Sequence, residues 1–136
     1  MTKVFLKDES FVDETRRLFE AFSRGDVLLA VPAFAYYEVV SNILRAGRQQ
    51  RLDEDAGYAA IESLFHLQLT TVDPPVRSLM PDAYVTAREQ NCGLYDAIFL
   101  VVSRSIEAPL VTADRPLFNA ARGRYDVIWI ADLNLP

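Results

Sequence analysis

Two kinds of apolar pattern alternate along the chain. Four short runs are rich in β-branched and aliphatic residues and predict strands, at 27–31, 67–73, 108–114 and 125–130. The segments around them space their apolar residues as helices do, at 11–22, 32–47, 53–65, 74–90, 95–105 and 115–121. Pro32 is expected to open the second helix, because proline suits the first helical turn.

This order of elements predicts an α/β fold. Strands that are short and apolar throughout are typical of a parallel sheet with helices on both faces. We therefore expect a three-layer α/β/α arrangement around a central parallel sheet, formed by a single domain over residues 1–136. In such a fold, ligands bind beyond the carboxyl ends of the strands.

The composition argues against several classes of protein. The one cysteine, Cys92, and the one histidine, His66, give little support to a disulfide framework, a Cys/His zinc site or a histidine-dependent hydrolase. The chain has no apolar run long enough to cross a bilayer and no apolar signal core at its start, so we expect a cytoplasmic protein without membrane contact. A net charge of −5 argues against a strongly basic nucleic-acid surface, although a local basic patch stays compatible with it.

Three carboxylates stand in apolar sequence near the ends of predicted elements. Asp114 lies where a strand gives way to a helix, and Asp96 lies in the first turn of the helix that carries the longest apolar run. Glu38 lies inside a helix between apolar neighbours, which argues against an ordinary solvated acid. Carboxylates that converge repel one another unless a cation lies among them, and Mg²⁺ or Mn²⁺ with oxygen ligands is the expected cofactor. Such a site performs phosphoryl chemistry.

Each acid also has a plainer interpretation. Asp96 can serve only to stabilise a helix N-terminus, Asp114 only to cap the next helix, and Glu38 can be a buried acid paired with an arginine. The three together, in a chain without cysteine or histidine chemistry, favour the shared site.

Arginines and aromatic residues supply weaker signals. The densest basic stretch contains Arg45, Arg48 and Arg51, which are candidate RNA contacts, although a solvated helix end is the favoured explanation. Arg115 follows Asp114 and is a candidate contact for RNA phosphate or for an antitoxin carboxylate, or simply neutralises its neighbour. Several aromatic side chains at helical spacing are expected in the core rather than on a base-stacking surface, namely Phe34, Tyr36, Tyr37, Phe65 and Tyr95.

Three segments together resemble the PIN domain, and specifically the VapC-type toxins of toxin–antitoxin pairs. They are "PAFAYYEVVSNILRA" (32–46), "GLYDAIFLVVSR" (93–104) and "APLVTADRPLFNAA" (108–121). Their order and spacing match the family's motifs for its second, third and fourth acids. The resemblance covers nearly the whole chain.

The resemblance implies a metal-dependent endoribonuclease, the toxin of a type II toxin–antitoxin system, that leaves a 3′-hydroxyl and a 5′-phosphate. Glu38, Asp96 and Asp114 would be its catalytic and metal-binding acids, and Asn42 and Thr112 would orient them. The implied partners are the RNA substrate, a second copy of the chain in a homodimer, and a VapB-like antitoxin whose C-terminal segment occupies the acidic groove.

The family's first acid has no clear counterpart. The segment "VFLKDES" (4–10) resembles the stretch between the family's first strand and its first helix, so we expect that strand and its Asp to precede Met1. In the alternative alignment, residues 3–6 form the first strand and Asp8 is the first acid. A missing acid would weaken metal binding, which favours a second hypothesis: a catalytically impaired PIN-like module that binds a protein or RNA. An aspartyl-phosphate receiver is disfavoured, because every lysine lies in the first seven residues.

Overall fold

The computed structural model describes residues 10–135 and divides them into two compact units, with the boundary between Thr71 and Val72. Asp8 and the alternative first strand at 3–6 lie outside the described residues. The α/β fold class predicted from the sequence is confirmed, because helices and paired strands occur in both units. That the chain forms one domain stays a prediction.

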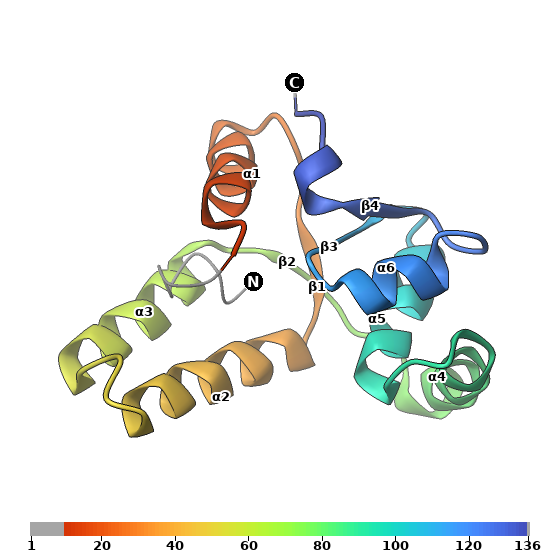
Figure 1. Ribbon diagram of the computed structural model, residues 1–136, viewed down its shortest axis with the longest axis horizontal. Coiled ribbons are helices and arrows are strands. Elements are labelled where there is room, and N and C mark those ends of the chain that lie inside the picture. The colour runs from red at the N-terminus through yellow and green to blue at the C-terminus, as the bar shows by residue number, and fades with distance from the viewer. Residues whose placement is uncertain (1–9, 136) are drawn as a thin grey trace. The chain divides into compact units, whose positions relative to one another are not determined.

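The first unit contains three helices and two short strands (Figure 1). In chain order they are α1 (Val12–Arg24), β1 (Ala30–Pro32), α2 (Phe34–Arg48), α3 (Glu54–His66) and β2 (Thr70–Val72), with β1 paired to β2. The unit boundary falls before Val72, the last residue of β2. Helix α1 ends at Gly25, whose φ of 79° lies in the left-handed region that glycine adopts without strain, and whose N–H donates to the last carbonyls of the helix. The helix predicted over 11–22 is therefore confirmed, and it ends two residues later than predicted, at Arg24.

Packing of α2 against α3 forms the core of the first unit. Val39, Ile43 and Leu64 are buried at its centre, and partly buried apolar side chains surround them. Burial of each such side chain stabilises the fold by about 1.5–3 kcal/mol. Asp53 begins α3 by accepting a hydrogen bond from the N–H of Ala56 at 2.8 Å, so the predicted start of this helix is confirmed to one residue.

Pro32 does not open α2, contrary to the expectation from sequence. It is the last residue of β1, and α2 begins at Phe34. Proline lacks an N–H, so it is tolerated at a strand end as well as in a first helical turn, and the sequence alone does not separate these two positions.

The second unit contains the remaining elements (Figure 1). They are α4 (Val76–Gln90), α5 (Leu94–Ser105), β3 (Leu110–Thr112), α6 (Arg115–Ala121), β4 (Val127–Trp129) and a 3₁₀ turn, η2 (Ile130–Asp132). Strands β3 and β4 pair in parallel, with Leu110 opposite Val127 and Thr112 opposite Trp129. The carboxyl ends of both strands therefore lie at the same edge of this small sheet.

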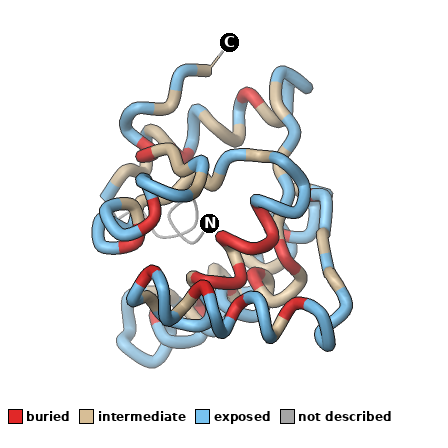
Figure 2. Tube along the Cα trace, turned by 90° about the vertical axis from the view of Figure 1, so that its right-hand side faces the viewer, coloured by how far each residue is buried: buried red, intermediate tan, exposed pale blue. Residues whose placement is uncertain are grey.

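Helix α5 supplies much of the buried surface of the second unit (Figure 2). Six of its twelve residues are buried, as its long apolar run predicts: Ala97, Ile98, Leu100, Val101, Val102 and Ser103. It packs against α4 and β3, and Leu100 forms a cluster with Leu117 and Ala121 of α6. This packing fixes the position of the first turn of α5 relative to β3 and α6.

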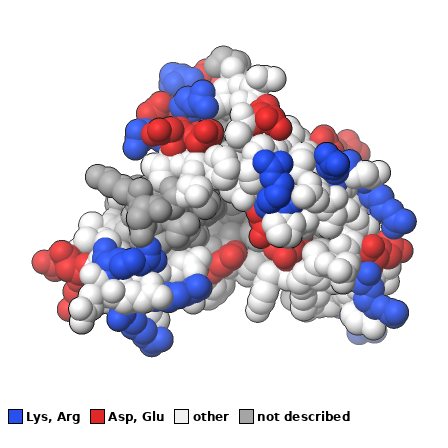
Figure 3. Space-filling model, viewed as in Figure 1, with Lys and Arg blue, Asp and Glu red and all other residues white. Residues whose placement is uncertain are grey.

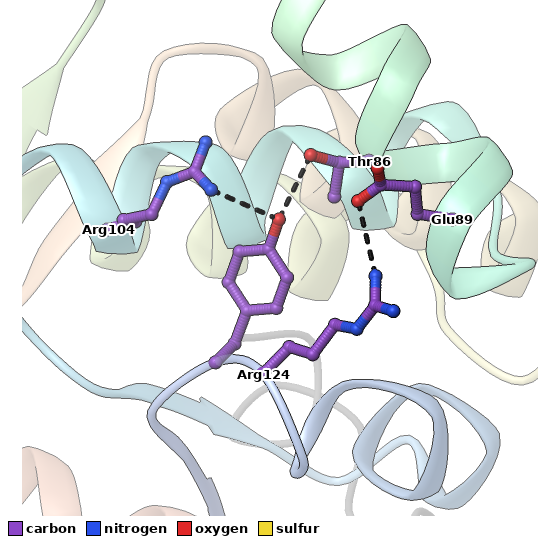
Figure 4. A network of polar contacts seen from close by, with 5 residues as sticks. Thr86, Glu89, Arg104 and Arg124 are labelled. Atoms are coloured by element: carbon purple, nitrogen blue, oxygen red, sulfur yellow. Dashed lines mark hydrogen bonds and ion pairs between the residues drawn. The ribbon is translucent and has the colours of Figure 1, made fainter.

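A polar network joins α4, α5 and the segment before β4 (Figure 4). The hydroxyls of Thr86 and Tyr125 lie 3.0 Å apart, and Arg104 donates to the same tyrosine oxygen at 3.5 Å. Arg124 and Glu89 form an ion pair at 3.4 Å. The network holds these elements together at the end of α5 remote from Asp96. Over residues 10–135, no helix is both long and apolar enough to span a membrane.

Candidate functional site

Asp96 lies in the first turn of α5, where its carboxylate folds back over the start of the helix. Gly93 is the N-cap residue, and its backbone hydrogen bond to the Asp96 carboxylate lowers the pKa of that group. The Asp96 Oδ2 atom lies 3.4 Å from the point that a Cβ on Gly93 would occupy, so glycine leaves room for this approach. An acid that returns to the N-cap N–H from the third helical position is one half of a capping box. This local role explains an acid at the front of a buried apolar run.

Asp114 lies between β3 and α6 and caps the helix. Its Oδ1 atom accepts a hydrogen bond from the N–H of Leu117 at 2.8 Å, and its own N–H donates to the Thr112 hydroxyl at 3.0 Å. Thr112, expected to orient the acids, therefore holds the backbone of Asp114 in place. The interpretation of Asp114 as a helix cap is confirmed, and capping uses one carboxylate oxygen, which leaves Oδ2 for another ligand.

Asp114 lies close enough to Asp96 for its negative charge to act on the Asp96 carboxyl group. Partial burial is the larger cause that raises the pKa of Asp96, and the negative charge of Asp114 raises it further; the hydrogen bond from Gly93 opposes both. Two of the three predicted acids are thus brought together within the second unit. Asp96 is partly buried and Asp114 is exposed. A like charge beside a partly buried carboxyl group disfavours its ionisation unless a cation lies between the two, and carboxylate oxygens are ligands that Mg²⁺ and Mn²⁺ accept.

Cys92 lies just behind this acidic pair. Its side chain is half-buried against the cluster that contains Leu100 and Leu117. Burial raises the pKa of the thiol, and the charge of Asp96 raises it further. Both effects favour the neutral thiol over the reactive thiolate.

Glu38 lies in the first unit, on α2, and its side chain is exposed. The expectation that its apolar neighbours exclude water from it is wrong, and so is its interpretation as a buried acid. Because successive helical residues point about 100° apart, Val39 can be buried in the core while Glu38 faces solvent. Asn42 follows one turn later and accepts a hydrogen bond from Arg45, so these three polar residues share one face of α2.

The predicted RNA-contacting arginines have different surroundings. Arg45 and Arg48 lie in the last turn of α2, and Arg51 follows it; basic side chains gather over this end of the helix (Figure 3). Arg115 directly follows Asp114, and its guanidinium carbon lies 3.7 Å from the centroid of the Trp129 ring. A cation over an aromatic face at this distance is held in place by the ring's quadrupole. No sequence pattern pointed to this contact, because Arg115 lies on α6 and Trp129 lies on β4.

Three aromatic residues that we expected in the core are exposed. Tyr37 is 77% exposed, Tyr95 66% and Phe65 57%. Tyr36 is partly buried against the first core and stacks on Phe65, with the ring centroids 5.5 Å apart. Helical spacing places residues on a common face but does not say whether that face is covered, which is why the expectation failed.

No group of three or more Asp, Glu, His or Cys side chains within the described part of the chain is arranged to hold a metal ion. Asp96 and Asp114 nevertheless have the donor chemistry that a divalent cation needs. Both are carboxylates, and each makes one hydrogen bond at a helix start. A cation between them would relieve the repulsion that contributes to the raised pKa of Asp96.

Comparisons with known proteins place this geometry in a family context. A family model described as the PIN domain matches residues 2–123. Among solved structures, the crystal structure of PAE2754 from Pyrobaculum aerophilum is similar in fold, with a TM-score of 0.68 and 20% sequence identity over 89% of this chain and 83% of that one. A search of curated proteins finds no significant match.

Replacing Asp96 by Asn is expected to stabilise the metal-free protein at neutral pH. The raised pKa of Asp96 means that the folded state favours the protonated acid. The stability that protonated Asp96 gives to the folded state is therefore fully present below about pH 4, the pKa of an aspartic acid in the unfolded chain. This stability is lost as the pH rises through the raised pKa of Asp96 in the folded state. The gain should be no more than about 1 kcal/mol, because partial exposure screens the charges.

Urea unfolding of the wild-type protein and Asp96→Asn in EDTA, from acidic to neutral pH, measures this effect. The stability difference should grow with pH over that range. A variant less stable than the wild type at neutral pH would show that the capping contact of the charged group outweighs its repulsion from Asp114.

Asp114→Ala is expected to lower the free energy of unfolding by about 1 kcal/mol, because it removes the cap of α6. Asp114→Asn should leave stability nearly unchanged, since an amide oxygen caps equally well. Asp53→Ala and Asp53→Asn, at the cap of α3, provide a matched pair with the same expected pattern. Equal losses for the Ala and Asn variants of Asp114 would contradict the capping role.

Proposed function

The chain belongs to the PIN-domain family, and from this membership we propose that it is a metal-dependent endoribonuclease, the toxin of a type II toxin–antitoxin pair. PIN domains are generally nucleases, often metal-dependent ribonucleases. The observation that carries the proposal is the electrostatic coupling of Asp96 and Asp114 near the carboxyl end of β3. That is where ligand sites form in α/β folds.

In the proposed site, Asp96 and Asp114 hold Mg²⁺ or Mn²⁺, and Glu38 contributes the third carboxylate. Glu38 enters the set through the family resemblance of its segment, and its exposure on α2 leaves the carboxylate accessible. The bound cation supplies a Lewis acid for the phosphodiester and offsets charge on the leaving oxygen. Thr112 fixes the backbone that carries Asp114, and Asn42 would act similarly beside Glu38.

The proposed arginine contacts position the RNA backbone. Arg115 presents a guanidinium next to Asp114, and the Trp129 ring limits its movement, so little side-chain entropy is lost when it meets a phosphate. Arg45, Arg48 and Arg51 form a second, exposed basic group around the end of α2. These contacts add affinity without reading sequence, as phosphate contacts generally do.

RNA cleavage by purified protein tests the nuclease proposal. Cleavage of a labelled RNA mixture should require Mn²⁺ or Mg²⁺ and stop in EDTA. Asp96→Asn, Asp114→Asn and Glu38→Gln should each reduce the rate at least about a hundredfold, which corresponds to about 3 kcal/mol of lost transition-state stabilisation.

Two controls separate loss of the site from loss of a charge elsewhere. Asp53→Asn changes another helix-capping aspartate, and Glu62→Gln changes another exposed helical glutamate; neither should affect cleavage. Asp8→Asn tests the alternative first acid. Metal-independent cleavage, or full activity of Asp96→Asn, would contradict the proposal, and RNA binding without cleavage would favour a binding module.

Induced expression in bacterial cells tests the toxin part of the proposal. The wild-type chain should arrest growth, and Asp96→Asn, which keeps the fold, should not. Co-expression of the antitoxin should restore growth by covering the acidic site, and the purified pair should elute as one complex that also contains a homodimer of this chain. Normal growth with a chain that cleaves RNA in vitro would separate nuclease activity from a toxin role.

A further inference from the structure

Tyr95 occupies a distinctive place beside the acidic pair. It directly precedes Asp96 in the first turn of α5, and 66% of its surface is exposed. A single exposed tyrosine is ordinary on a protein surface. Here, however, the exposed tyrosine is the direct sequence neighbour of Asp96, on whose carboxyl group the charge of Asp114 acts, while Ala97 and Ile98 are buried.

The backbone that carries this ring is rigid. The N–H of Ala97 donates to the Gly93 carbonyl at 3.0 Å, which closes the first helical turn around Tyr95. The buried face of α5 holds the same turn against the rest of the second unit. A tyrosine on a fixed backbone has only two side-chain torsions to order when it meets a ligand, so the entropic cost of contact is low.

Electrostatics make such a contact useful to the proposed nuclease. The chain has a net charge of −5, and the site itself is built from carboxylates, which repel RNA phosphates. A contribution that does not depend on charge would therefore add affinity for RNA beside Asp96, in addition to the bound cation and Arg115. Stacking of a base on an aromatic ring is such a contribution, because every base has a flat apolar face.

We propose that Tyr95 stacks on the RNA base next to the phosphate that is cleaved at Asp96 and Asp114. This inference rests on the proposed function and adds a substrate-positioning residue to it. Tyr95 holds the base, and Arg115, which directly follows Asp114 and lies against the Trp129 ring, meets the RNA backbone.

The experiment uses a short RNA whose cleaved bond has been mapped. It also uses variants of this RNA in each of which one base beside the cleaved bond is replaced by an abasic ribose. Tyr95→Ala should raise KM for the intact RNA about tenfold with little change in kcat, and Tyr95→Phe should behave as wild type. For the RNA that lacks the stacked base, wild type and Tyr95→Ala should have the same KM. Tyr58→Ala is the matched control, since Tyr58 is 65% exposed and lies on α3.

A measurement without catalysis separates this inference from the nuclease proposal. In the Asp114→Asn protein, 2-aminopurine at the stacked position should lose fluorescence on binding, and additional Tyr95→Ala should abolish that loss. Equal effects of Tyr95→Ala on intact and abasic RNA, or no effect on either, would overturn the role of Tyr95. Failure of the wild-type protein to cleave any RNA would instead overturn the nuclease proposal, and the fluorescence change would still decide whether Tyr95 stacks.

Discussion

The burial of α5 is the constraint on which the second unit depends. Its apolar residues contact α4, β3 and α6, so the helix can shift neither along its axis nor about it without exposing them. The first turn of α5 is therefore fixed relative to the end of β3. Because Asp96 lies in that turn and Asp114 at that strand end, packing of apolar side chains sets the separation of two carboxylates that would otherwise move apart.

The acidic pair imposes a cost on the fold, and local hydrogen bonds offset part of it. Each carboxylate stabilises a helix start, Asp96 through Gly93 and Asp114 through Leu117. The proposed ligand-binding role is compatible with this structural role, because one carboxylate oxygen can contact the helix start while the other binds a ligand. Residual repulsion of this kind is common at sites selected for binding rather than for stability.

A site that holds both a cation and RNA beside Asp96 and Asp114 needs negative charge for the cation and other groups to attract the RNA. In the proposed site, the carboxylates would bind a cation and repel RNA, whereas Arg115 and the exposed ring of Tyr95 would favour RNA through charge and stacking. The arginine is held by Trp129 of β4, and the tyrosine by the first turn of α5. Rigid elements thus carry both groups, which limits the entropy lost on binding.

Local signals in the sequence were sufficient for the order of the elements, for the bounds of α6 at 115–121, for the start of α3 to within one residue, and for the cap at Asp114, because each depends on neighbouring residues. They also singled out the acids. Tertiary structure alone decided that Asp114 acts on Asp96, that Arg115 lies on Trp129, and that Glu38, Tyr37 and Tyr95 are exposed. Periodicity groups residues by helix face, but coverage of a face depends on elements distant in sequence, and so do contacts between strand ends.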